Sequence, residues 1–554
     1  MEFNLADLFE SVVDVASGSL ALVAGERRLT YEALDERANR LAHHLAGAGV
    51  GAGDRVGLQL VNGSEYLEGM IACFKIRAVP VNVNYRYVAA ELRHLYADAG
   101  LVAVVAHARF VPAASAALDA LAECRVLLQV AEDDAAPGAE GTGAAWDDYE
   151  QVLAAAPGGR GFPARSADDV YCVYTGGTTG MPKGVLWRHE DIFFAAMGGG
   201  DPLSMGNTIT EPEQLASRVL RPGIVALAIP PFMHASGHWL AFSNMFGGGT
   251  VVTLPHGRFD PAEVWRLVEA ERVNALVLVG DAMARPLLDE LERAPEGRDL
   301  SSLLAIGSGG ALLSASTKQR IAEQLPGRMV ADLFGSSETG QMGGEQRAGD
   351  PYGAPRLRVG ETTNVLDDDL RPVVPGSGVV GRLARRGHVP IGYLGDPAKS
   401  AATFVVADGT RWSLPGDMAT VDAEGVIELL GRGSLSINTG GEKVYPDEVE
   451  SVLKSHPDVV DAVVVGAPDE RFGQQVCAVV QFRPGRSVPA GDLQGFCRDR
   501  LTAYKIPRRV VAVDHVVRSP AGKADYPWAA ALVAGEGPQA PPRARGSGPP
   551  PGRA

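Results

Sequence analysis

Short apolar runs that end in glycine- or proline-rich loops recur along this chain and alternate with stretches of helical periodicity. After Thr30, a candidate N-cap, apolar residues return at the spacing of an amphipathic helix through Leu45. Later runs have the pattern of buried strands, at residues 170–177, 224–232, 275–280 and 303–310. Strands that alternate with helices predict an α/β fold, in which functional loops follow the strand ends.

The chain is too long for one hydrophobic core. At 554 residues, at least two domains are expected. Near residue 432 the pattern changes to loop, helix, strand, turn and strand, which predicts a separate small α+β domain. We expect a large N-terminal domain of mixed sheets and helices at 1–432, a small mobile domain at 433–534 and a disordered Pro/Gly-rich tail at 535–554. The Ala/Gly-rich residues 131–160 are expected to form an irregular surface segment.

Charge and composition exclude several classes of function. The 51 Lys+Arg against 67 Asp+Glu give a net charge of −16, which repels a phosphate backbone, so no nucleic-acid partner is expected. The five cysteines lack metal-site spacing and favour a reducing cytoplasm over a disulfide framework. No run approaches about 18 apolar residues, and the acidic start does not have the pattern of a signal peptide, so neither a transmembrane segment nor export is expected. The oligomeric state stays open.

The strongest motif is the run from Tyr174 to Gly184, where four glycines, three hydroxyl side chains and one lysine occupy eleven positions. Such a loop can surround a polyphosphate with backbone N–H groups, hydroxyls and an ammonium. It is not a Walker A loop, because Pro182 precedes Lys183 and Gly184 follows it. The run resembles the phosphate-binding loop of the adenylate-forming superfamily, which comprises acyl-CoA synthetases, luciferases and peptide-synthetase adenylation domains. By this resemblance, the ATP-binding residues here are Thr175, Gly176, Gly177, Thr178, Thr179, Gly180 and Lys183.

A second motif, residues 333–339, is similar to that superfamily's aromatic-Gly-x-Thr-Glu sequence. The resemblance implies that Phe334 stacks on adenine, Ser337 contacts phosphate and Glu338 binds Mg²⁺. Ser337 stands where threonine is usual and keeps the hydroxyl. A carboxylate oxygen suits a hard cation that also contacts substrate phosphates.

Further matches follow the order of motifs in the superfamily. A glycine-rich loop after an apolar strand resembles the one that lines the adenine and acyl pockets, and glycines there allow close backbone approach. Its members are Gly307, Gly309, Gly310 and Ala311. Asp417 and Arg432 resemble the pair that binds the ribose and phosphate, since a carboxylate accepts from a diol and a guanidinium donates to anionic oxygen.

Three more positions carry implied functions. Lys523, in Ser-Pro-Ala-Gly-Lys, resembles the adenylation lysine, which supplies positive charge where negative charge builds in the transition state. His234 matches a position beside the acyl pocket, although a histidine satisfied within the core fits equally well; His238 has no assigned function. Gly440 and Gly441 would line the CoA path.

The resemblance extends from about residue 8 to 534 and is nearest to actinobacterial synthetases of fatty, steroid-derived or other bulky acids. It implies ATP- and Mg²⁺-dependent adenylation of a small-molecule acid with release of pyrophosphate, then transfer of the acyl group to CoA after the small domain rotates. The superfamily usually carries an acidic hinge residue two positions after the arginine, but Ser434 occupies that position here. The Gly433-Ser434 pair can still absorb a change of φ and ψ.

Two alternatives remain open in the sequence. One is a diazotase of secondary metabolism, which adenylates nitrite for transfer to an aryl amine and needs no CoA. The other is a noncatalytic nucleotide- or acyl-binding protein, since a fold does not determine function. The second alternative predicts a loss of Lys523 or Glu338, and both residues are present.

Overall fold

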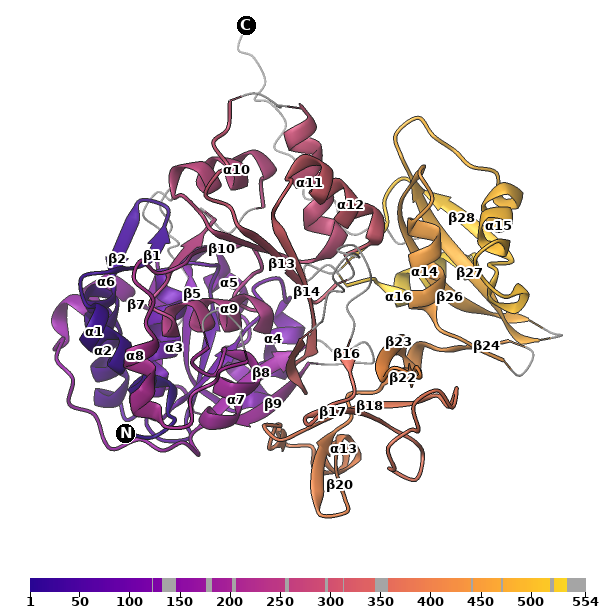
Figure 1. The fold of residues 1–554 in the computed structure, drawn as a ribbon. Coiled ribbons are helices and arrows are strands. Elements are labelled where there is room, and N and C mark those ends of the chain that lie inside the picture. The colour runs from indigo at the N-terminus through magenta and orange to yellow at the C-terminus, as the bar shows by residue number, and fades with distance from the viewer. Residues whose placement is uncertain are drawn as a thin grey trace, which may run out of the picture. The chain divides into compact units, whose positions relative to one another are not determined.

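The computed structural model describes residues 1–121, 123–131, 146–175, 182–201, 206–254, 259–293, 297–311, 313–343, 357–439, 442–469, 472–518 and 523–535. The chain divides into two compact units, Met1–Leu429 and Leu430–Ala554 (Figure 1). The sequence places this division between residues 432 and 433. The predicted tail lies outside the described residues from 536 onward.

The largest sheet of the first unit has eight strands. From β14 to β1 neighbouring strands are parallel, and the outer pairs at both ends are antiparallel. The order is β15 (Gly340–Gly343), β14 (Met329–Ser336), β13 (Ala305–Gly309), β12 (Ala275–Leu278), β10 (Val225–Ala228), β11 (Thr250–Thr253), β1 (Leu20–Ala24) and β2 (Arg27–Thr30). The runs predicted as strands at 224–232, 275–280 and 303–310 are confirmed as strands, and the structure shows that they are neighbours in one sheet.

Helices cover this sheet because their apolar faces pack against its buried residues. In Figure 1, α10 (Pro261–Ala270), α11 (Gly280–Arg293) and α12 (Ala315–Gln324) lie together beside β10, β13 and β14. Val264, Leu287 and Ile321 from these helices share one buried cluster with Leu276 and Ile306 of the strands. This core holds the carboxyl ends of β13 and β14 in place.

A second sheet of the first unit is wholly parallel. Its order is β4 (Val79–Asn82), β3 (Arg55–Gln59), β5 (Leu101–His107), β6 (Val126–Val130) and β7 (Asp147–Asp148). The accompanying helices are α1 (Leu5–Ala16), α2 (Tyr31–Gly47), α3 (Ser64–Lys75), α4 (Ala89–Ala99), α5 (Val111–Ser115) and α6 (Tyr149–Ala155). The Thr30 side chain accepts a hydrogen bond from the Ala33 N–H at the start of α2, which confirms the predicted cap.

One local prediction is wrong. Residues 146–160, the described end of the segment expected to be irregular, contain β7 and α6. The Asp148 side chain caps α6 by accepting from the Gln151 N–H at 2.9 Å. Tyr149 and Leu153 are buried, so tertiary packing stabilises a helix that its Ala-rich sequence leaves without a clear apolar face.

Two further sheets, of three and seven strands, belong to the first unit apart from the last residues of β23, 430–432. One contains β19 (Gly392–Tyr393), β9 (Lys183–Arg188) and β8 (Val170–Thr175), and its hairpin leads into α7 (His189–Ala196). The other joins β16 (Leu357–Arg358), β23 (Val426–Arg432), β22 (Asp417–Val421), β18 (Gly381–Arg386), β21 (Thr410–Ser413) and β20 (Phe404–Ala407), with β17 (Thr363–Leu366) on β18. The remaining helices are α8 (Leu215–Arg218), α9 (Ala235–Phe246) and α13 (Pro397–Thr403).

The second unit is α+β, as predicted. Its sheet contains β25 (Glu442–Val444), β24 (Ile437–Thr439), β27 (Gly473–Phe482), β26 (Val459–Asp469) and β28 (Arg509–Val513). Its helices are α14 (Pro446–Lys454), α15 (Ala490–Arg498) and α16 (Tyr526–Ala534). Val449, Leu453 and Leu493 pack on one face of this sheet, and Ala529 and Val533 of α16 belong to a second apolar cluster with its strands. No helix among the described residues has the length and apolarity needed to cross a membrane.

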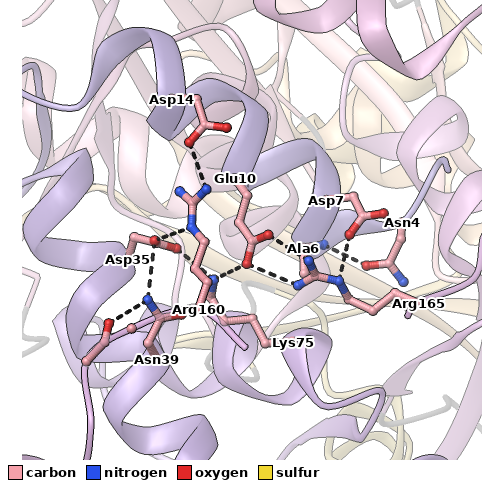
Figure 2. A network of polar contacts seen from close by, with 12 residues as sticks. Asn4, Ala6, Asp7, Glu10, Asp14, Asp35, Asn39, Lys75, Arg160 and Arg165 are labelled. Atoms are coloured by element: carbon pink, nitrogen blue, oxygen red, sulfur yellow. Dashed lines mark hydrogen bonds and ion pairs between the residues drawn. The ribbon is translucent and has the colours of Figure 1, made fainter. Parts of the chain in front are cut away.

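A network of charged side chains connects the first three helices to the segment after α6 (Figure 2). Lys75 of α3 is fully buried, and its Nζ contacts Glu10 Oε1 at 2.5 Å and Asp35 Oδ1 at 2.7 Å. Arg165 and Arg160 contact the same two carboxylates from the chain beyond α6. The network therefore fixes the packing of α1, α2 and α3 behind the second sheet.

Candidate active site

The carboxyl ends of β13 and β14 bring two predicted motifs side by side. The strands are parallel, with Gly307 opposite Ala331 and Gly309 opposite Leu333, so both motifs leave the sheet at the same edge, Gly310 and Ala311 after β13 and Ser337 after β14. Gly310 has a φ of +84°, a conformation that favours glycine, and a Cβ on Gly309 would lie 3.4 Å from the Leu333 carbonyl oxygen. Phe334 is partly buried against the cluster that includes Leu357.

A tight turn after β14 presents Ser337 and Glu338. The Ser336 N–H donates to Thr339 Oγ1 at 3.1 Å, and the Glu338 N–H donates to Ser336 Oγ at 3.3 Å. Gly340 ends the turn with a φ of +68°, and a Cβ there would come within 2.5 Å of the Ala195 carbonyl oxygen. Only glycine fits this position, because without a Cβ the turn can pack directly against the backbone of α7.

Glu338 is held by two hydroxyl groups from other strands. The Tyr393 hydroxyl donates to Glu338 Oε1 at 2.9 Å, and the Ser413 hydroxyl donates to the Glu338 carbonyl oxygen at 2.5 Å. Its second carboxylate oxygen, Oε2, has no hydrogen-bond partner within the part of the chain that the structure describes. An oriented carboxylate with one uncommitted oxygen can accept a hard cation.

Lys183 lies opposite Thr175 in the β8–β9 hairpin, at the two ends of the phosphate-loop motif. Its ammonium forms an ion pair with Asp396, which also caps α13 by accepting from the Lys399 N–H. The hydrogen bond from Lys183 holds the pKa of Asp396 below its ordinary value. A phosphate oxygen at Lys183 would therefore compete with the Asp396 carboxylate for the ammonium.

A direct hydrogen bond connects the hairpin to the Glu338 turn. Trp187 Nε1 of β9 donates to the Ser337 carbonyl oxygen at 3.0 Å. Because the indole is fully buried, this contact holds β9 and the turn in one rigid arrangement. The segment Tyr393–Asp396 adds a second connection, because Tyr393 bonds to Glu338 and Asp396 pairs with Lys183.

The predicted acyl-side residue His234 is the N-cap of α9 and is half-buried. The neighbouring His238 is fully buried, with Nδ1 2.7 Å from the Phe232 carbonyl oxygen and Nε2 against the Tyr171 hydroxyl. Burial lowers the pKa of His238 to about 4, so its ring is neutral near pH 7. His238 is a structural histidine with partners on both ring nitrogens.

The remaining predicted site residues lie in other parts of the chain. Asp417 begins β22 in the first unit and is buried. Gly176, Gly177, Thr178, Thr179 and Gly180 lie outside the described residues, as do Gly440 and Gly441. Arg432, whose backbone ends β23, and the exposed Lys523 belong to the second unit.

Sequence reasoning missed Tyr393, Ser413, Asp396 and Trp187. The Asp396-Pro397 pair is a helix-start signal and predicts α13. Nothing local indicates that its carboxylate meets a lysine 213 residues earlier. Tyr393 and Ser413 likewise reach Glu338 only through strand pairing.

Comparison with known proteins covers both units. Residues 9–394 match the family described as AMP-binding enzyme, and residues 448–523 match the AMP-binding enzyme C-terminal domain. A 3-oxocholest-4-en-26-oate–CoA ligase of Rhodococcus rhodochrous is 46% identical over 536 residues, 96% of each chain. A medium/long-chain-fatty-acid–CoA/3-oxocholest-4-en-26-oate–CoA ligase of Mycobacterium tuberculosis is 44% identical over 530 residues, 95% of each chain. The crystal structure of the anthranilate CoA ligase AuaEII with anthranoyl-AMP shares the fold, with a TM-score of 0.80 and 22% identity over 96% of this chain and 98% of that one.

Proposed function

This chain belongs to the AMP-binding enzyme family, and from that premise we propose that it is an acyl-CoA ligase with its adenylation centre around Lys183 and Glu338. The predicted membership of the adenylate-forming superfamily, near actinobacterial acyl-CoA synthetases, is confirmed by these relatives. The predicted enzyme class, an AMP-forming ligase, is confirmed with it. The roles of individual residues below are proposals.

The observation that carries the assignment is that one short segment, Tyr393–Asp396, contacts both groups: Tyr393 donates to Glu338, and Asp396 forms an ion pair with Lys183. A metal-bound nucleoside triphosphate requires a positive group for its phosphates and an oxygen ligand for its cation. The Lys183 ammonium and Glu338 Oε2, which has no hydrogen-bond partner among the described residues, are groups of these two kinds. The ammonium pairs with phosphate oxygens, and the carboxylate pairs with the cation. The residues present therefore fit Mg²⁺ and ATP.

Adenylation begins when a carboxylate oxygen of the acid attacks the α-phosphorus of ATP and pyrophosphate leaves. A bound Mg²⁺ supplies charge neutralisation on the phosphates. Lys183 and Thr175 hold phosphate oxygens, and the Tyr393 hydroxyl keeps the Glu338 carboxylate oriented. Catalysis by these residues consists of positioning and charge stabilisation.

Residues outside this centre bind the rest of the nucleotide and the second substrate. Phe334 packs on adenine, while Asp417 and Arg432 bind the ribose and phosphate. Lys523 stabilises the charge that builds during adenylation. In the second half-reaction the CoA thiol attacks the acyl carbonyl and AMP leaves, with Gly440 and Gly441 along the thiol's path.

We propose that the acid is a bulky hydrophobic carboxylic acid of the fatty or steroid-derived class, because both relatives described above carry such acids in their names. A reducing, cytoplasmic location is proposed from the cysteines. Cys73, Cys172, Cys477 and Cys497 are buried free thiols, and burial raises the pKa of Cys73 far above its ordinary value.

The test is pyrophosphate release with ATP and Mg²⁺ against fatty, steroid and aromatic acids, and against nitrite with an aryl amine, each with and without CoA. Release with a bulky carboxylic acid and a new CoA thioester is the expected result. Release only in the reaction with nitrite and an aryl amine, without any use of CoA, would establish the diazotase instead. Nucleotide binding without turnover of any acid would indicate a noncatalytic protein.

A further inference from the structure

Three buried polar side chains hold the segment Pro230–His234, here called the acyl-side segment, by its backbone. Asn62 Oδ1 accepts from the Phe232 N–H at 2.6 Å, and its Nδ2 donates to the Pro230 carbonyl oxygen at 3.0 Å. His238 contacts the Phe232 carbonyl oxygen, and Asn82 contacts the Met233 carbonyl oxygen. The position of His234 is therefore set by side chains that do not face solvent.

Asn82, the last residue of β4, connects this segment to β8. Its Oδ1 accepts from the Tyr174 N–H at 2.7 Å, and its Nδ2 donates to the Tyr174 carbonyl oxygen at 2.8 Å. The second Nδ2 hydrogen goes to the Met233 carbonyl oxygen at 2.7 Å. Since β8 is an edge strand of its sheet, the amide of Asn82 takes the place of a neighbouring strand at Tyr174.

His238 forms a second connection between the same two elements. Because a carbonyl oxygen can only accept, His238 Nδ1 carries the hydrogen toward Phe232, and Nε2 accepts from the Tyr171 hydroxyl. The Tyr171 oxygen in turn accepts from Trp239 Nε1 at 2.9 Å. The acyl-side segment is thus joined to β8 at Tyr171 and at Tyr174.

We propose that Asn82 is a positioning residue that sets the acyl carboxylate against the α-phosphate during adenylation, an inference that rests on the proposed function. Tyr174 is the first residue of the phosphate-loop motif and directly precedes Thr175, and Met233 directly precedes His234. The Asn82 side chain therefore bonds to the backbone next to Thr175, a proposed phosphate-binding residue, and next to His234, a proposed acyl-side residue. Displacement of one reacting group by about 1 Å lowers a rate by about 100-fold.

Only an amide side chain can form all three of these hydrogen bonds at position 82. Asn82 uses one acceptor and both donor hydrogens, and an aspartate of the same shape would turn a carboxylate oxygen toward two carbonyl oxygens. The substitution N82D therefore keeps the volume and the Tyr174 N–H bond while it removes the hydrogen bonds to the carbonyl oxygens of Tyr174 and Met233. We expect N82D to affect catalysis by changing the position of the Met233 backbone relative to that of Tyr174.

Asn244 of α9 supplies a matched control away from this connection. Its Nδ2 also donates to two backbone carbonyl oxygens, of Ile224 at 3.1 Å and Thr250 at 2.9 Å, at the amino ends of β10 and β11. N244D removes the same kind of bridge and lowers thermal stability, but it touches neither β8 nor the acyl-side segment.

The experiment measures two half-reactions separately in wild type, N82D and N244D. Pyrophosphate release reports adenylation, and formation of the CoA thioester from a supplied acyl adenylate reports the second step. N82D is expected to lower the kcat of adenylation about 100-fold while thioester formation stays within about 3-fold of wild type. N244D is expected to change neither rate by more than about 3-fold.

Equal adenylation rates in N82D and N244D, with an active wild type, overturn the positioning role alone. A parallel fall of both half-reactions in N82D also overturns it, because this is the signature of general misfolding. A wild type that adenylates no acid overturns the proposed function and this inference together. If N82D does not fold, N82A, which leaves a small cavity instead of a repulsive oxygen, is judged by the same two rates.

Discussion

Replacement of Lys75 by methionine is expected to destabilise the first unit strongly, although Lys75 lies outside the candidate active site. Lys75 is fully buried between Glu10 and Asp35, with Nζ–oxygen distances of 2.5 and 2.7 Å (Figure 2). Arg165 and Arg160 contact the same two carboxylates, so K75M leaves both with one cationic partner each. A methionine nearly keeps the volume and removes the charge with its hydrogen bonds to Glu10 and Asp35.

The magnitude follows from the burial. Removal of one partner from a buried ion pair destabilises by about 3–5 kcal/mol, because the remaining charge stays desolvated. Unfolding entropy of about 2.1 cal/mol/K per residue over the unit Met1–Leu429 gives about 0.9 kcal/mol/K. The melting temperature is therefore expected to fall by about 3–6 °C.

The assay is differential scanning calorimetry at pH 7, with R371A as control. The Arg371–Asp369 pair is largely exposed, so R371A is expected to change stability by less than about 0.5 kcal/mol. A K75M shift no larger than that of R371A would refute the reasoning, since it would mean that the buried network contributes nothing net.

The pH dependence of K75M gives an independent check. Burial alone would raise the pKa of Glu10, but the hydrogen bond from Arg165 and the charges of Lys75 and Arg165 outweigh burial and hold the pKa below its ordinary value of 4.5. A depressed carboxyl pKa stabilises above the unfolded-state pKa, and this stability disappears as pH falls through the folded-state pKa. The stability difference between wild type and K75M should therefore be full at pH 7 and shrink below about pH 4.5.

Three further predictions concern the candidate active site. Y393F is expected to raise the Mg²⁺ concentration for half-maximal pyrophosphate release about 10-fold, because Glu338 loses its orienting hydroxyl; an unchanged Mg²⁺ titration would contradict the metal-ligand role. D396N is expected to lower the KM for ATP about 2- to 5-fold in steady-state kinetics, because Asp396 competes with phosphate for Lys183; a raised KM would show that Asp396 orients the lysine instead. K523A is expected to slow adenylation about 10²–10³-fold while CoA thioester formation from a supplied acyl adenylate is retained; equal losses in both steps would argue against its role.

Much of the architecture could be read from local pattern. The Thr30 cap and the 3.6-residue period after it predict α2, and the apolar runs before glycine loops predict β8, β10, β12 and β13. The helix α6 was missed because its stability comes from burial of Tyr149 and Leu153 and not from a local periodicity. The sheet order could not be read at all, since strand neighbours such as β11 and β1 lie far apart in the chain.

The sequence by itself determined the α/β class, the small α+β domain near the C-terminus and the motifs that mark an adenylate-forming enzyme, because these depend on residue type, period and short spacing. Only the tertiary structure decided which side chains orient the residues of these motifs. Tyr393 bonds to Glu338 across 55 residues of sequence, and Asp396 bonds to Lys183 across 213. Asn82 bonds to Tyr174 and to Met233 across 92 and 151 residues. Contacts at such separations have no local signature, because chain topology creates them when sheet edges and loops meet.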